Sequence, residues 1–505
     1  MNRLVLAFGI VCLLQGISAE PKPEFGLLIE IPSSDRVATV NTDTDNILRE
    51  IKNINLYAPT SGATKLTETK TKIGEIQTKI DELGKPIITA YTKLRSAQDG
   101  DVDAAFLDLE TTIEAAATYI GNAANLHSAF TTIGYNGIAD EVMDAFTRLM
   151  NGLNEFKSKL TVVKTAIKAT VTQAGSNEIT VNMVRTNLAP RKMFDLLRAA
   201  NYLKASLPLV KYIVVTVDEN VKEADTFIKD IMTRVGSGVT TEVANFKAEL
   251  KEATDACKEV VTSRSTTASN TVSALTGAVA GYTGISTATD IGALNSAIES
   301  LYTTFTTGSN TKVSELATAF DHIGTALEGF VNSITSQVNV LNNDLVNYLV
   351  DVLMGNDEYG RYCYHKYKDL VNGIFDYGFD LSWQCIDKEY SRLMHLKDTF
   401  SIIFDLLVFD VEDAESQLGV CNLITTTATM NACVTQMKTY LTALFAETEV
   451  KLGLLKSFGV DEAVASENRL LICMQLSNIE TSIIYPSKIK ANIKLCNDSG
   501  PNGTD

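Results

Sequence analysis

The sequence is poor in proline and contains no long uninterrupted apolar run beyond its first residues. Proline occurs 9 times in 505 residues and is absent from residues 87–189 and 209–485. Because proline breaks helix interiors, these two stretches can form very long helices. The longest apolar stretch in the body of the chain, 402–411, is interrupted by Asp405 and Asp410. It falls short of the roughly 18 apolar residues that a membrane span requires, so we predict no integral membrane span.

Catalytic motifs are also missing. The chain has no nucleophile elbow, no phosphate-binding glycine loop and no dinucleotide fingerprint. None of its four histidines is followed at three or four residues by another histidine or cysteine, the spacing typical of a zinc site; they are His127, His322, His365 and His395. We therefore predict a protein that is not an enzyme and has no cofactor.

Acidic residues outnumber basic ones, and the formal net charge is −17. A strongly acidic surface repels the phosphate backbone of nucleic acids and anionic lipid alike. The composition therefore predicts that nucleic acid is not a partner.

The first residues have the pattern of a secretory signal. Arg3 precedes an apolar run from Leu4 to Leu14, and Ala19 is a small residue at the expected cleavage point. The apolar run is too short to cross a bilayer. We predict that residues 1–19 are removed, that the mature chain begins near Glu20, and that the protein is secreted and extracellular.

The cysteines are concentrated in the last third of the chain. Cys12 lies in the predicted signal and Cys257 stands alone; the other six are Cys363, Cys385, Cys421, Cys433, Cys473 and Cys496. Six cysteines in one region of an exported chain predict three disulfides. Cys257 occupies an apolar seam position, which favours a buried, inert thiol, although an unpaired exported cysteine can also join two chains.

The spacing of the six cysteines predicts which of them pair. In an antiparallel helical hairpin, facing residues have numbers that add to a nearly constant value. This holds for Cys421 with Cys433, Cys385 with Cys473, and Cys363 with Cys496. We predict a nested ladder with its turn at 422–432, and with Gly373, Gly378 and Gly459 breaking the two arms. A Cys363–Cys385 bridge would instead indicate sequential local pairing.

Apolar residues recur at alternating spacings of three and four, which is a heptad pattern. Five such seams occupy residues 66–97, 102–130, 142–167, 214–260 and 313–352. Since a helix with one apolar face must pack that face against something, the seams predict an all-α protein. The partner is another helix of the chain or a second chain, and in the second case the seams would mediate self-association. At Gly236-Ser237-Gly238 the spacing slips by one, which indicates a stutter or, as the small residues favour, a turn.

These patterns divide the chain into seven segments. The signal, 1–19, and an extended segment, 20–35, precede a helical bundle or coiled coil at 36–261. A connection rich in Ser, Thr, Gly and Ala, with one short helix near 291–305, is predicted at 262–311 because helix propensity is poor there. A long helix at 312–355, a disulfide-bonded helical module at 356–496 and a polar tail at 497–505 follow.

One segment has the ligand spacing of a calcium loop. Asp99, Asp101, Asp103 and Glu110 fall at positions one, three, five and twelve, but Ala104 stands where the sharp turn requires glycine. The alternative is a helix N-terminus, where aspartates cap free N–H groups. Because the heptad pattern is already in register at residue 102, capping is the favoured interpretation.

Two other features carry open alternatives. Nine aromatic residues lie between 359 and 390, a density suited to a ligand groove or to the core of a small domain, the latter being favoured. Two glycosylation sequons begin at Asn497 and Asn502 in the polar tail.

The C-terminal cysteine framework resembles that of the tsetse EP-type domain. The residues concerned are Cys363 with its neighbouring tyrosines, Trp383-Gln384-Cys385, Gly419-Val420-Cys421, Asn431-Ala432-Cys433 and Leu471-Ile472-Cys473. The resemblance covers the last third of the chain or less, and the Glu-Pro repeats of the founding protein are absent. It implies an insect extracellular protein of gut or haemolymph with a link to immunity, and it implies no catalytic residues.

The function predicted from these observations is that of a secreted, non-enzymatic helical interaction or scaffold protein, whose protein or glycan partner the sequence does not name. The alternative is a membrane-active or lipid-binding protein whose amphipathic helices open onto lipid, with 272–285 as the inserting element. The acidic net charge argues against this alternative.

Overall fold

A computed structural model describes residues 24–98, 100–335 and 339–501. Within these ranges the chain forms helices and one isolated bridge between Glu24 and Leu27, without a β-strand. The prediction of an all-α fold is therefore confirmed. The predicted signal, 1–19, lies outside the described residues.

The described residues form two compact units, which we treat separately. Unit 1 contains the chain up to Asp230, together with Asp344–Lys368 and the residues from Lys490 onward. Unit 2 contains Ile231–Asn343 and Asp369–Ile489. This division cuts across the predicted segments: the ends of the cysteine-rich region belong to unit 1 and its middle to unit 2.

Unit 1 is a packed set of helices. Its helices are α2 (Ser34–Lys52), α3 (Thr64–Ser96), α4 (Val102–Gly121), α5 (Ala123–Ile133), α6 (Asn136–Ala174), α7 (Val181–Asn187), most of α8 (Pro190–Thr233), α12 (Asp344–Gly355), the start of α13 (Gly360–Asn422) and most of α15 (Tyr485–Ser499). Helix α3 packs against α2 and α4, and α6 packs against α4 and α5. The predicted seams supply the core, since Leu66, Phe106 and Phe146 are buried.

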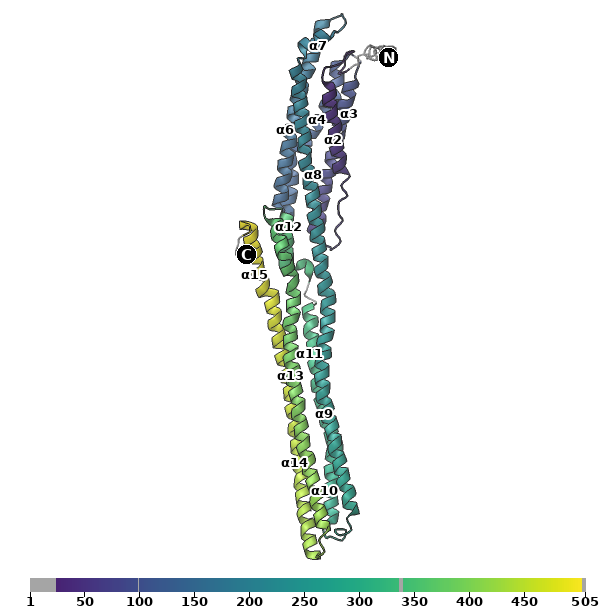
Figure 1. The fold of residues 1–505 in the computed structure, drawn as a ribbon, viewed down its shortest axis with the longest axis vertical. Coiled ribbons are helices and arrows are strands. Elements are labelled where there is room, and N and C mark those ends of the chain that lie inside the picture. The colour runs from purple at the N-terminus through teal and green to yellow at the C-terminus, as the bar shows by residue number, and fades with distance from the viewer. Residues whose placement is uncertain (1–23, 99, 336–338, 502–505) are drawn as a thin grey trace, which may run out of the picture. The chain divides into compact units, whose positions relative to one another are not determined.

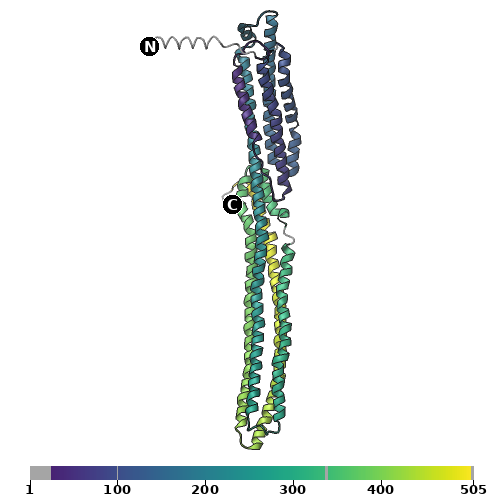
Figure 2. The same ribbon diagram turned by 90° about the vertical axis from the view of Figure 1, so that its right-hand side faces the viewer.

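Unit 2 is a four-helix bundle. Its helices are α9 (Val239–Gly281), α10 (Ile291–Thr303) with α11 (Ser309–Thr335), most of α13, and α14 (Thr427–Ile479). Helix α11 packs between α9 and α14, disulfides join α14 to α13, and Trp383 of α13 packs against Phe246 of α9 at a centroid distance of 4.8 Å. In both views these segments run side by side (Figure 1, Figure 2). One continuous apolar core lies between them.

Residues 262–281 differ from the prediction of a connection, because they form the second half of α9. The hydroxyl groups of Thr262, Thr266 and Thr271 donate to carbonyl oxygens four residues earlier, so they do not compete with the helix. The segment also buries an apolar stripe: Ala268, Val272, Leu275 and Val279. Packing of this stripe outweighs the poor helix propensity of the composition. The short helix predicted near 291–305 is α10.

The glycines at 236–238 do not produce the turn that was favoured. Residues Arg234–Gly238 form a π-helical turn with helical backbone on both sides. A π turn accommodates an extra residue without breaking the helix, so helical backbone continues through these three residues. A second π turn, Thr304–Gly308, joins α10 to α11.

The predicted long helix at 312–355 is wrong. Helix α11 ends at Thr335, and a 3-10 turn at Val340–Asn342 precedes α12. The side chain of Asn339 accepts a hydrogen bond from the N–H of Leu341 at 3.0 Å. Asparagine side chains that bond to nearby backbone favour turns and caps over helix interiors. Asn342 and Asn343 then lead to Asp344, the first residue of α12.

The glycines predicted to break the hairpin arms lie inside unbroken helices. Gly373 and Gly378 are in α13, and Gly459 is in α14. At Gly459 a Cβ would lie 2.5 Å from Cδ1 of Leu316 and 2.8 Å from Cζ of Phe400. This glycine therefore serves the close packing of α14 against its neighbours.

Candidate interaction surface

Disulfide bonds link α13 to the helices that follow it. The structure contains the three pairs of the predicted ladder: Cys363–Cys496 in unit 1, and Cys385–Cys473 and Cys421–Cys433 in unit 2, with Cα–Cα distances of 5.9, 5.8 and 5.7 Å. Helix α13 ends at Asn422 and α14 begins at Thr427, so the turn falls in the predicted segment. In unit 2, α13 and α14 form an antiparallel hairpin closed near each end by a covalent bond.

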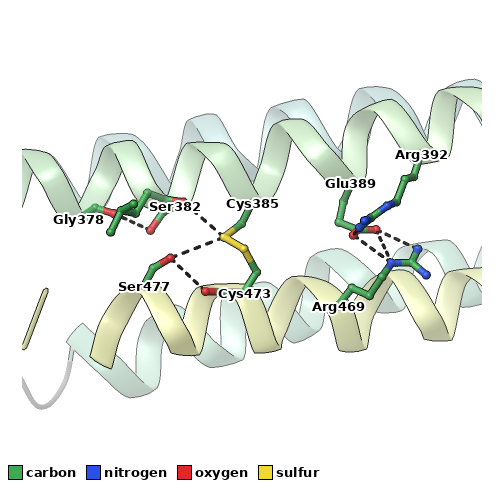
Figure 3. The surroundings of a disulfide bond; sticks show 9 residues. Gly378, Ser382, Cys385, Glu389, Arg392, Arg469, Cys473 and Ser477 are labelled. Atoms are coloured by element: carbon green, nitrogen blue, oxygen red, sulfur yellow. Dashed lines mark hydrogen bonds and ion pairs between the residues drawn. A yellow bond between two sulfur atoms is a disulfide. The ribbon is translucent and has the colours of Figure 1, made fainter. Parts of the chain in front are cut away.

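A buried ion pair lies about one helical turn from the Cys385–Cys473 bond (Figure 3). Glu389 is 2% exposed, and its carboxylate accepts hydrogen bonds from Arg469 at 3.1 Å and from the hydroxyl of Ser466 at 2.8 Å. Arg392 also donates to it, and Arg469 reaches Glu462 at 2.7 Å. Because a buried carboxylate is costly unless it is fully partnered, this network favours the observed register of α13 against α14 over registers that would separate Glu389 from Arg469.

An apolar patch lies on the outer face of this hairpin. Six large apolar side chains are 47% to 66% exposed there: Ile402, Leu406 and Phe409 on α13, and Val450, Leu454 and Phe458 on α14. On each helix they recur at spacings of three or four and so share one face. The core-facing residues of the same turns, among them Phe404 and Leu455, are buried. Single exposed apolar residues are ordinary, whereas a cluster of this kind makes the face a candidate binding surface.

The register of the hairpin brings the two halves of the patch level with each other. The Cys385–Cys473 bond lies on one side of these residues and the Cys421–Cys433 bond on the other, and the register between the two bonds places Ile402 level with Leu454 and Leu406 level with Val450. We refer to the six residues as the hairpin patch.

Four carboxylates frame the hairpin patch. On α13, Asp398 lies four residues before Ile402 and Asp413 lies four residues after Phe409. On α14, Glu447 and Asp461 lie three residues before and three residues after the patch residues. Positions three or four residues apart lie on the same helix face, and all four carboxylate residues are exposed. The patch is thus apolar at its centre and negatively charged at both ends.

Cys257 does not line this surface. It is fully buried in unit 2, where its Sγ lies 3.1 Å from the carbonyl oxygen of Leu393. Burial raises the pKa of its thiol to about 12. Since the thiolate is the reactive form, this arrangement favours the inert buried thiol over a bond between two chains.

The calcium candidates of unit 1 have other partners. The Asp101 carboxylate accepts a hydrogen bond from the N–H of Ala104 at 3.0 Å and caps α4. Asp103 pairs with Lys164 and Lys168, and Glu110 pairs with Lys164. Hydrogen bonds from these lysines lower the pKa of Asp103. Asp99 lies outside the described residues. The contacts of Asp101, Asp103 and Glu110 therefore agree with a capped helix N-terminus.

The histidines and aromatics do not gather into a second site. Three histidines face carboxylates on different helices: His127 with Asp140, His322 with Glu467, and His365 with Glu223. Among the described residues, no three metal-ligating side chains form a group that could hold an ion. Tyr359 precedes α13, and the other aromatics of 359–390 are spread along this helix; Tyr364 and Tyr367 are buried, whereas Tyr362 is exposed.

The sequon at Asn497 lies within α15 in unit 1. Its side-chain amide donates to Asp357 at 3.0 Å, so carriage of an oligosaccharide would require this contact to open. The sequon at Asn502 lies outside the described residues.

Sequence reasoning missed the hairpin patch, although its signal was present. The apolar stretch 402–411 contains two stripes: a buried one at Phe404, Leu407 and Val411, and an exposed one at Ile402, Leu406 and Phe409.

No described helix combines the length and apolar content that crossing a membrane requires. Comparison of the sequence with protein-family models and with curated proteins found no match.

Proposed function

We propose that this protein is a secreted, non-enzymatic interaction protein that binds its partner through the hairpin patch. The observation that supports this most strongly is the patch itself: six exposed apolar side chains on a helical hairpin braced by two disulfides and a buried ion pair. A rigid face that is already formed loses little conformational freedom on binding, which favours affinity.

Secretion is supported by the signal-like first residues and by three disulfides, which persist in oxidising compartments. The resemblance of the cysteine framework to the tsetse EP-type domain makes an insect extracellular fluid or gut, and a role in immunity, part of the proposal. An oligosaccharide on Asn497 also belongs to it, whereas the seams predicted for self-association are buried in the core of the chain itself.

Site-specific photo-crosslinking tests the proposal. A photoreactive phenylalanine analogue is placed at Leu454 in the patch or, as a matched control, at Phe194 on α8 in unit 1, which is similarly exposed. Both variants are secreted and irradiated in the extracellular fluid in which the protein occurs. We expect a discrete crosslinked product from position 454 alone, and its loss when Leu406→Asn is added. Equal products from both positions, or none from 454, would contradict a role for the patch.

A further inference from the structure

We propose that the occupant of the hairpin patch is a cationic amphipathic helix of another polypeptide. This inference rests on the proposed function and names the chemistry of the partner. Its basis is the combination of an apolar centre with carboxylates at both ends.

The apolar part of the patch suits a helix of a few turns. The stripes 402–409 and 450–458 are each about 10–12 Å long at 1.5 Å per residue. They run side by side on antiparallel helices held in one register by the Cys385–Cys473 bond. An amphipathic helix laid along them would insert apolar side chains at positions i, i+3 or i+4, and i+7, as in other helix-in-groove complexes.

The four carboxylates that frame the hairpin patch favour a helix with positively charged side chains. Within the described part of the chain, Asp413, Glu447 and Asp461 form no ion pair, while Asp398 has Lys397 at 3.7 Å. Lys451, the cation next to Val450, pairs with Asp410. Lysine or arginine residues flanking the apolar side chains of a docked helix would meet unneutralised carboxylates.

The same frame disfavours two other occupants. A second copy of the chain would bring the acidic frame of one patch against that of the other, because a symmetric contact joins like surfaces. An anionic lipid surface would meet the same repulsion. The charge pattern therefore favours a basic helix over both.

Fluorescence anisotropy with defined peptides tests the proposal on the full secreted chain. The probe is a labelled amphipathic 18-residue peptide of leucine and lysine; its control has glutamate at every lysine position. We expect saturable binding of the lysine peptide only. Leu406→Asn with Leu454→Asn should weaken it at least tenfold, and Asp413→Asn with Glu447→Gln about three- to tenfold with a smaller salt dependence. The matched charge control, Glu299→Gln with Asp387→Asn, should leave it unchanged.

The outcomes separate this inference from the proposed function. Binding of both peptides with equal affinity, or of the lysine peptide with no loss in the Leu406/Leu454 variant, would overturn the inference. Patch-dependent self-association in sedimentation, or patch-dependent binding to phosphatidylcholine vesicles, without peptide binding would also overturn it, and self-association would leave a protein-binding patch standing. Circular dichroism of each variant shows whether the chain is folded.

Discussion

At the scale of single residues, unit 1 holds the carboxylate of Asp225 inside a shell of hydrogen-bond donors. Asp225 on α8 is fully buried, and its carboxylate accepts hydrogen bonds from the hydroxyl of Tyr57 at 2.8 Å and the N–H groups of Thr60 and Ser61 at 2.9 and 2.8 Å. Lys229 lies 3.0 Å away. Burial alone would raise the pKa of Asp225, but these hydrogen bonds outweigh it and lower the pKa to about 2. The carboxylate thereby ties the 53–63 segment to α8.

Replacing Asp225 with asparagine tests how much this carboxylate stabilises the fold. The pKa falls from 3.8 to about 2, which corresponds to about 2–3 kcal/mol at about 1.4 kcal/mol per unit. A carboxyl group with a lowered folded-state pKa stabilises the fold above its unfolded pKa, and the contribution is lost as the pH falls through the folded value. We expect Asp225→Asn to lower the free energy of unfolding by about that amount at pH 7, measured by chemical denaturation.

The pH dependence supplies the control. Between pH 4 and pH 2 the wild type should lose this contribution, so the difference from Asp225→Asn should shrink. Asp230→Asn, at an exposed position on the same helix, should behave like the wild type. A constant difference between wild type and Asp225→Asn over this range would show that the carboxylate charge is not what stabilises the segment.

Sequence reasoning could predict the seam around Asp225 but not its role. Ala224 and Ile228 are seam positions, and a charged residue beside them is normally read as solvent-facing. The partners that make its burial favourable come from residues 57–61, far away in the sequence. Asp101 is the opposite case, because its partner is close in the sequence. It caps α4 by accepting a hydrogen bond from Ala104, three residues later, so its role was predictable.

At the scale of helices, the packing of α14 depends on a glycine. The space around Gly459 is filled by Leu316 and Phe400, whereas nothing lies within 4 Å of a Cβ placed at Gly453 on the same helix. Gly459→Ala should therefore overpack unit 2 and cost about 1–3 kcal/mol. Gly453→Ala should gain a few tenths to about 1 kcal/mol, because alanine is the better helix former. Thermal unfolding of the two variants compares them directly, and equal shifts in Tm would contradict the close packing at Gly459.

The two disulfides of unit 2 should differ in their effect on stability. Cys385–Cys473 closes a separation of 88 residues and Cys421–Cys433 one of 12. In the chain-entropy model a longer closed loop gives more stabilisation, and the difference here is about 2 kcal/mol. We expect Cys385→Ala/Cys473→Ala to lower the free energy of unfolding more than Cys421→Ala/Cys433→Ala does. The reverse order in denaturant unfolding would indicate that native packing, rather than loop closure, dominates.

The arrangement of these elements was partly predictable. The two cysteine pairs of unit 2 follow from residue numbers because α13 and α14 run without a break, so the register set at the turn persists along the hairpin. Residues 262–281 were missed because their threonines bond within the helix and their apolar stripe packs on distant helices. Composition alone reports neither effect.

At the scale of the whole molecule, the sequence predicts an all-α chain with disulfides and does not locate the proposed binding surface. Heptad analysis finds residues that turn inward, whereas the hairpin patch consists of residues that turn outward on two different helices. Ile402 and Leu454 become neighbours only once the hairpin register is known. The proposed function therefore requires that these side chains face solvent and are free to bind.

Hydroxyl-radical footprinting with mass spectrometry measures the solvent exposure of these side chains in the native chain. We predict that Ile402, Leu406, Leu454 and Phe458 are oxidised as readily as Leu107 on α4, which is similarly exposed, while Leu407, Leu452 and Leu455, buried in the same turns, are protected. If the patch residues were protected as strongly as their buried neighbours at every protein concentration, the face would be covered by the chain itself, and the account of a free binding surface would be contradicted.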